Sequence, residues 1–205
     1  MNEDLKDLAI DLSEVALDSL SENELVKDIP VIGTFVRLAR VTRSIPDLIF
    51  AKKVERFISA SEPIARDKRT RFHARLEAEP ELRRKAGECI VLTLDRVDDL
   101  KKTAIIGKLF SYFVAGEITF EVLRRILAAV DRAFIDDLLN FPQWALQQRL
   151  ANGFDPRSLE GTGLVEPAYP RFGGIRSNAS AAPQFGYSEL GGVYARLFLG
   201  YQPQA

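Results

Sequence analysis

Hydrophobic and polar positions follow a helical period from the N-terminus to about Asn140. Between residues 3 and 26, apolar residues recur at three- and four-residue steps, which predicts an amphipathic helix with an acidic outer face. Prolines and capping residues then divide the chain into further predicted helices. We expect these helices at about 46–60, 66–79, 80–97, from the Asp98-Asp99 pair to Gly116, at 119–139 and at 142–151.

The composition changes after Asn140, where glycine, proline, serine and aromatic residues become frequent. Short strands are predicted at 161–166 and 184–187, with a long loop at 170–183 between them and a final helix at 188–199. The expected fold class is therefore mainly α, with a multi-helix bundle at 1–118 and a small α+β part at 119–205. Because helix 119–139 can belong to both parts, a single compact unit is the alternative.

Seven residues of the C-terminal part follow the pattern with which winged-helix domains end. Leu159, Gly163, Leu164 and Val165 match a strand that leads into a hairpin wing, and Tyr187, Leu190 and Gly191 match the start of the last helix. The last 85 or so residues therefore resemble winged-helix domains, with Ser188 in place of the usual downstream threonine.

The resemblance implies nucleic-acid binding or a protein-interaction module. A reading helix must project several side chains into a groove, whereas the segment before Gly161 allows only one or two turns and carries one cation, Arg157. The wing would add Arg171 and Arg176 as phosphate contacts.

The N-terminal part contains a second recognisable pattern. Residues 29–36 read Ile-Pro-Val-Ile-Gly-Thr-Phe-Val, and residues 44–53 read Ser-Ile-Pro-Asp-Leu-Ile-Phe-Ala-Lys-Lys. This pattern resembles uncharacterised bacterial helical proteins and implies no particular activity. Residues 30–58 are apolar with interleaved cations, which suits a core helical hairpin, a partner groove or a membrane-surface helix.

Charge is distributed unevenly, although the net charge of the whole chain is only −1. Residues 1–36 contain nine acidic and two basic residues, whereas residues 37–75 contain eleven basic and four acidic residues. The two blocks either pair with each other or leave the basic block to face a polyanion, such as phosphate or anionic lipid. The candidate polyanion contacts in this block are Arg37, Arg40, Arg43, Lys52, Lys53 and Arg56.

No constellation of residue types in the sequence points to catalysis, a metal or a cofactor. The single cysteine, Cys89, lies in an apolar run, and the single histidine, His73, lies among charged residues. One residue of each kind cannot supply a zinc site, and the phosphate-binding and nucleophile-elbow glycine motifs are absent. We therefore expect no enzyme activity and no cofactor.

The expected function is that of a bacterial-type binding or regulatory protein. It would act through a protein partner or self-association, with nucleic-acid contact as an addition. The alternative is a peripheral membrane-associated or membrane-disrupting effector of the stress or phage-defence type, which would use segment 30–58 on an anionic membrane. The acidic N-terminus is unlike a signal peptide, and no apolar run is long enough to span a membrane, so the cytoplasm is the expected location.

Overall fold

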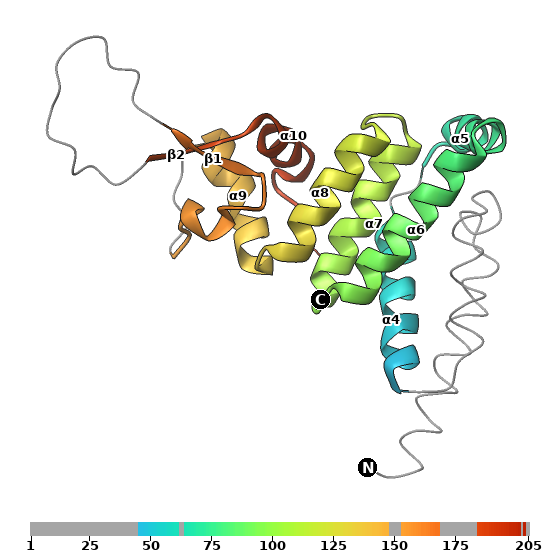
Figure 1. Ribbon diagram of the computed structural model, residues 1–205, viewed down its shortest axis with the longest axis horizontal. Helices are drawn as coiled ribbons and strands as arrows, with labels where there is room; N and C mark the ends of the chain where they lie inside the picture. The colour runs from blue at the N-terminus through green and yellow to red at the C-terminus, as the bar shows by residue number, and fades with distance from the viewer. Residues whose placement is uncertain (1–44, 62–63, 148–152, 169–183, 202, 204–205) are drawn as a thin grey trace, which may run out of the picture. The chain divides into compact units, whose positions relative to one another are not determined.

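The computed structural model describes residues 45–61, 64–147, 153–168, 184–201 and 203. Within these ranges the chain forms seven α-helices, one 3-10 helix and two strands, which confirms the mainly α fold class (Figure 1). The chain divides into two compact units between Arg124 and Arg125. The predicted helix 3–26 and five of the candidate cations lie outside the described residues; these cations are Arg37, Arg40, Arg43, Arg171 and Arg176.

The first unit is built from helices around a largely buried central helix. These helices are α4 (Ile45–Ala60), α5 (Arg66–Ala78), α6 (Pro80–Arg96), α7 (Leu100–Val114) and the first turn of α8 (Phe120–Arg132). Helix α7 is buried along almost its whole length. Its Phe110 and Phe113 pack against Phe57 of α4, Phe72 of α5 and Phe120 of α8, with ring centroids 5.1–6.2 Å apart.

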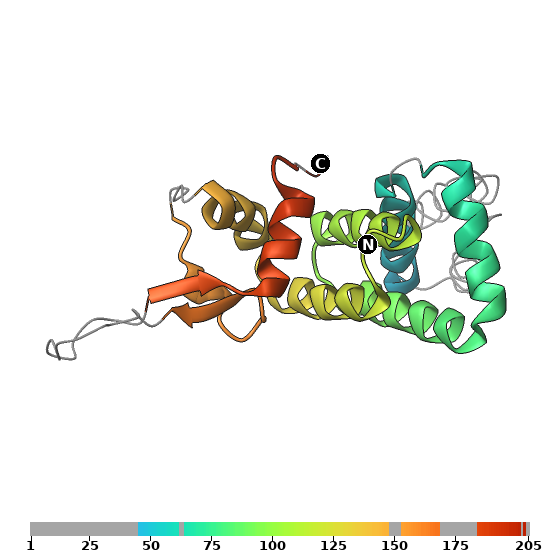
Figure 2. The same cartoon turned by 90° about the horizontal axis from the view of Figure 1, so that it is seen from above.

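Helices α4 and α7 pack closely along each other, because a glycine stands where they meet (Figure 2). A Cβ atom added at Gly107 would lie 2.3 Å from the Phe57 carbonyl oxygen and 3.2 Å from the Ala60 Cβ. The Ser61 hydroxyl lies 2.9 Å from the Phe57 oxygen and 3.4 Å from the Gly107 oxygen. Only a residue without a side chain permits this approach of two backbones.

The predicted helix starts of the first unit are confirmed, since the proposed caps make their hydrogen bonds. Asp99 accepts from the Lys101 backbone N–H at 2.6 Å, and Thr119 Oγ1 accepts from the Val122 N–H at 3.3 Å. Pro80 occupies the first turn of α6, where a missing N–H costs nothing. None of the described helices has the length and apolar character needed to cross a membrane.

The predicted single helix 119–139 is wrong, and so is the predicted helix start at Pro142. Helix α8 ends at Arg132, and α9 (Ile135–Gln147) follows with Pro142 in its interior. At the break Phe134 is 76% exposed, whereas Leu138 is fully buried. The apolar spacing continues across the interruption without a glycine or proline, so the pattern did not reveal it.

Pro142 is tolerated inside α9 because another residue replaces the hydrogen bond that it removes. A proline at 142 leaves the Leu138 carbonyl, four residues earlier, without its helical donor. The hydroxyl of Tyr194 donates to this carbonyl at 3.3 Å. Tyr194 is fully buried, stacks on Phe198 and packs against Phe141.

The second unit adds a small hairpin to helices α9 and α10 (Glu189–Phe198). After the 3-10 helix η1 (Pro156–Leu159), strand β1 (Val165–Ala168) pairs antiparallel with β2 (Gln184–Tyr187), with Val165 opposite Tyr187. Strand β2 is found where it was predicted. The first predicted strand begins four residues too early, because Gly161 and Gly163 have φ angles of 79° and 87°, which suit turns rather than a strand.

Residues from both parts of the winged-helix pattern contact each other where the hairpin meets α10. The Ser188 hydroxyl donates to the Gly163 carbonyl at 2.6 Å, and the Ser188 N–H donates to the Leu164 carbonyl at 2.9 Å. A Cβ atom at Gly191 would lie 2.1 Å from the Leu164 oxygen. The two halves of the sequence pattern are therefore packing residues of the second unit.

Candidate binding cleft between α4 and the start of α7

An open cleft of about 600 Å³ lies in the first unit, between α4 and the connection from α6 to α7. One wall is a stripe of α4 whose residues are three or four positions apart, so they share one face of the helix. The other wall is the N-terminal end of α7 with the residue before its cap. The lining residues are Lys52, Glu55, Arg56 and Ser59 on the first wall and Asp98, Asp99, Leu100 and Lys101 on the second.

Three cations line this cleft, and none of them has a neutralising partner among the described residues. The side chains of Lys52, Arg56 and Lys101 make no hydrogen bond or ion pair within the described part of the chain. Lys52 and Arg56 are one helical turn apart, which places their charges along the same wall.

The acidic residues of the second wall are engaged by their own surroundings. Asp98 Oδ1 accepts from Lys102 Nζ at 3.0 Å, and this bond holds the pKa of Asp98 below its ordinary value. Asp99 caps α7. Glu55, on the first wall, is the acidic lining residue whose carboxylate makes no hydrogen bond or ion pair among the described residues.

Two nearly buried lysines fix the connection between α6 and α7. Lys102 is 6% exposed and bonds to Asp98, whereas Lys53 of α4 is 9% exposed and donates from Nζ to the Asp95 carbonyl at 2.9 Å. Asp95 lies in the last turn of α6, where a cation satisfies a terminal carbonyl and complements the helix dipole. These lysines hold the second wall in place and add positive charge behind it.

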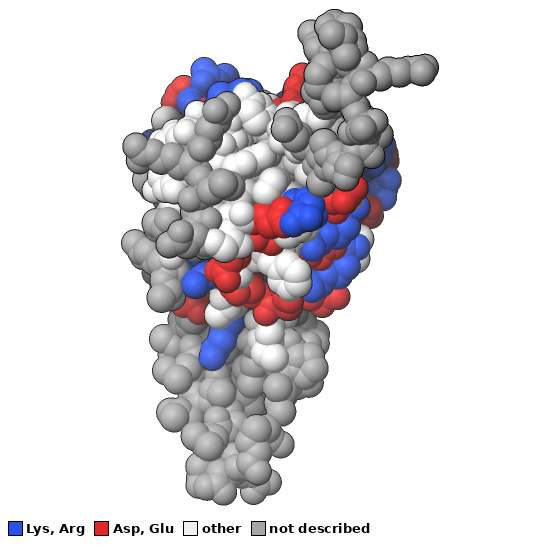
Figure 3. Space-filling view, turned by 90° about the vertical axis from the view of Figure 1, so that its left-hand side faces the viewer, with Lys and Arg blue, Asp and Glu red and all other residues white. Residues whose placement is uncertain are grey.

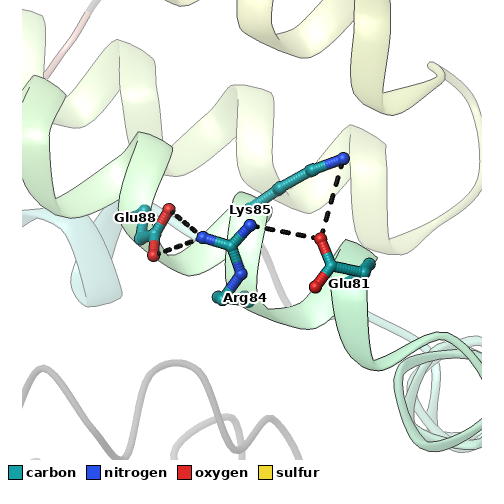
Figure 4. Close-up of polar contacts among 4 residues, drawn as sticks. All are labelled: Glu81, Arg84, Lys85 and Glu88. Carbon is teal, nitrogen blue, oxygen red and sulfur yellow. Dashed lines mark hydrogen bonds and ion pairs between the residues drawn. The ribbon is translucent and has the colours of Figure 1, made fainter.

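Two neighbouring cations on the exposed surface of α6, Arg84 and Lys85, are paired within the helix. Arg84 donates to both carboxylate oxygens of Glu88 at 2.8 and 2.9 Å and to Glu81 at 3.1 Å (Figure 4). Lys85 lies 3.8 Å from Glu81, whose pKa is lowered chiefly by its hydrogen bond to Arg84. Such pairs are common on a solvated helix surface, although Arg83 of the same helix has no side-chain partner among the described residues. The cleft is distinguished by the three such cations that line one hollow.

Apolar groups border the same cleft. Leu100 lines it and is 47% exposed, and Ile49, which is 52% exposed, lies one turn before Lys52 on α4. Val54, Phe57 and Ile58 of α4 point into the core, where they are at most 1% exposed. The apolar face of α4 is therefore used for folding, and what it offers outward is cationic with a small aliphatic border.

The predicted polyanion contacts are only partly brought together. Lys52 and Arg56 share the cleft, whereas Lys53 points the other way, into its bond with Asp95. Arg157 of η1 forms an ion pair with Asp155 at 2.6 Å, and this pair lowers the pKa of the aspartate. The sequence did not indicate Lys101, because its part in the cleft depends on where α7 begins relative to α4.

The remaining candidate groups for chemistry are scattered. Cys89 is half-buried, and this burial raises the pKa of its thiol, while His73 pairs with Glu77 at 3.5 Å. Among the described residues, no three histidine, cysteine or acidic side chains are grouped as a metal site. On the face seen in Figure 3, acidic and basic side chains alternate. No family model, curated protein or solved structure matches the chain.

Proposed function

We propose that this protein is a non-enzymatic binding or regulatory protein that acts through protein–protein contacts in the cytoplasm. The observation that carries the proposal is the α4–α7 cleft, in which three cations and one carboxylate that have no partner within the described ranges lie together with an exposed leucine. Small-molecule pockets enclose most of their ligand, whereas this cleft is open, and six of its eight lining residues carry a charge. A surface of this kind suits the polar part of a protein interface.

A nucleic-acid contact by the second unit remains an additional proposal. The order α9, η1, hairpin and α10 supports a winged-helix-like domain, and the wing cations Arg171 and Arg176 are the groups that would touch phosphate. Arg157 does not strengthen this proposal, because Asp155 already binds its guanidinium. We therefore treat base reading by η1 as the weaker part of the idea.

The membrane-effector alternative has less support in the described residues. It needs the apolar side chains of segment 30–58 to enter lipid, and those of α4 from Val54 to Ile58 are in the core of the first unit. That alternative would have to rest on residues 30–50, of which Ile49 is 52% exposed.

The test compares partner capture by the full-length protein and by the variant with Lys52→Glu and Arg56→Glu. A matched control reverses Arg83 and Arg125, which are exposed and have no side-chain partner among the described residues. Partners retained by the wild type and the control but lost by the cleft variant would support the proposal. Identical capture by all three proteins would refute it.

Light scattering after size-exclusion chromatography distinguishes nucleic-acid binding, membrane association and self-association. A mass increase with short duplex DNA that disappears at high salt would assign a polyanion contact, and the variant with Arg171→Glu and Arg176→Glu would test the wing. Co-elution with anionic liposomes would favour the membrane alternative instead. A stable homo-oligomer that the cleft variant dissociates would make the partner a second copy of the chain.

A further inference from the structure

From the distribution of unpaired charge in the α4–α7 cleft, we infer that its partner is an acidic, leucine-bearing segment of another protein. The inference rests on the proposed function and names the chemistry of the partner. It uses the three cations Lys52, Arg56 and Lys101 together with the aliphatic side chain of Leu100.

The balance of charge in the cleft is positive once the internal pairs are set aside. Asp98 is neutralised by Lys102, and Asp99 accepts the N–H of Lys101 at the start of α7. What faces a ligand is three cations against Glu55 and the capping carboxylate of Asp99, with the ammonium of Lys53 behind the wall bonded only to a backbone carbonyl in the contacts described. The positive end of the α7 dipole adds to this field.

The geometry of α4 defines how a partner would place its carboxylates. Lys52 to Ser59 covers seven helical rises, or about 10 Å, which is roughly two turns of a helix lying alongside. Lys52 and Arg56 are one turn apart, so acidic residues at i and i+4 of a partner helix would reach one cation each. An apolar residue between them would meet Leu100, whose side chain is 47% exposed. This is the arrangement of an amphipathic helix in a groove.

A protein segment fits this cleft better than a nucleic acid. A phosphate backbone carries a negative charge at every step, and it would meet Glu55 and the carboxylate of Asp99 as well as the cations. A peptide can place its own cation or a neutral residue opposite Glu55 and an aliphatic side chain on Leu100. Specificity of this kind arises from both attractive and repulsive contacts.

The experiment measures binding of a fluorescein-labelled peptide by anisotropy with the full-length protein. The probe has about 18 residues, enough for five helical turns, with leucine at every third or fourth position and glutamate at most of the others. We expect saturable binding that weakens as salt is raised through the range where the Debye length falls below about 10 Å. A second probe, with lysine in place of each glutamate, should not bind.

The cleft variant with Lys52→Glu and Arg56→Glu should bind the acidic probe at least about tenfold more weakly, since two attractions become repulsions. Leu100→Ser should weaken binding by a smaller factor and reduce the salt dependence little. The control with Arg83→Glu and Arg125→Glu carries the same change in net charge and should bind like the wild type. Far-UV circular dichroism confirms that each variant is folded before its affinity is interpreted.

Each outcome decides a different point. Equal binding by the wild type and the cleft variant, or no binding of the acidic probe to the wild type, would overturn the inference. Binding of the lysine probe alone would overturn it as well, yet it would leave the proposed protein-binding function standing. Binding of duplex DNA in competition with the acidic probe would replace the peptide by a polyanion. Failure of every peptide, together with unchanged partner capture by the cleft variant, would refute both proposals.

Discussion

The hydrogen bond from Tyr194 to the Leu138 carbonyl predicts that two residues far apart in sequence are energetically coupled. Pro142 removes the N–H that would normally pair with this carbonyl, and the tyrosine hydroxyl takes its place at 3.3 Å. Tyr194→Phe keeps the buried ring but leaves the carbonyl without a donor. The expected loss is about 1–3 kcal/mol of unfolding free energy, the range for a buried polar group that loses its partner.

The coupling becomes visible when Pro142 is changed as well. Pro142→Ala returns an N–H to the helix, which can donate to the Leu138 carbonyl. In this background Tyr194→Phe should cost less than it does with proline at 142, and the difference, which is the interaction free energy of the double-mutant cycle, should be about 0.5–3 kcal/mol. The absolute effect of Pro142→Ala does not enter this difference.

The assay is equilibrium unfolding in urea, followed by the fluorescence of Trp144, the single tryptophan of the chain. Trp144 lies in the same unit, with its ring 5.6 Å from that of Phe141 and 5.8 Å from that of Phe154. Tyr187→Phe, at a residue that is 45% exposed, controls for loss of a hydroxyl and should change stability by less than about 0.5 kcal/mol. If Tyr194→Phe costs the same with proline and with alanine at 142, the hydroxyl does not replace the missing helical donor and the explanation fails.

Three further predictions concern the alkaline limit, the helix crossing and the acid limit. Burial raises the pKa of Tyr194 above its ordinary value of 10.0. The contribution of the neutral Tyr194 hydroxyl to stability is therefore complete below pH 10 and is lost as the pH rises further. In urea titrations above pH 10, the Tyr194→Phe variant should lose less stability than the wild type. Gly107→Ala should destabilise the protein by about 1–3 kcal/mol, because the new methyl group meets the Phe57 carbonyl; an unchanged melting temperature by circular dichroism would contradict the close crossing. The pKa of Asp98 is lowered from 3.8 chiefly by its bond to Lys102. The stability that this ion pair contributes is therefore present above pH 3.8 and is lost below it. Asp98→Asn should flatten the fall of the urea midpoint below pH 3.8, and parallel curves for variant and wild type would argue against the ion pair.

Local signals were sufficient to predict most helices of the first unit. The apolar spacing gave α4 and α6 nearly at their observed bounds, the polar stretch that ends at Pro80 gave α5, and the Asp98-Asp99 pair marked the start of α7. These features depend on residues within one or two turns of each other. Ser188, the predicted first residue of the last helix, likewise caps α10 by accepting from the Gly191 N–H at 3.0 Å.

Features that depend on partners distant in sequence were not predictable in this way. The apolar period ran through the end of α8, and the only local mark of the new helix is the acidic pair in the first turn of α9. By local rules, Pro142 indicates a helix start. It lies inside α9 instead because its tolerance there relies on Tyr194, which is 52 residues away in the sequence.

The residues of the candidate site were likewise only partly predictable from the sequence. Lys52 and Arg56 were found by their position in a basic block, but the same reasoning included Lys53, which points inward. A charge count along the chain does not distinguish the faces of a helix. The second wall of the cleft could not be predicted from the sequence, because it forms only where the start of α7 lies beside α4.

The close crossing at Gly107 has a consequence for how any partner would associate. Because α4 and α7 touch through their backbones, these helices have little freedom to slide, and the first wall is rigid before a ligand arrives. Most of the ordering entropy of complex formation would then fall on the partner, whose segment must become helical on the surface. Widening the crossing, as Gly107→Ala does, would therefore change how fast a partner dissociates even where every lining residue is kept.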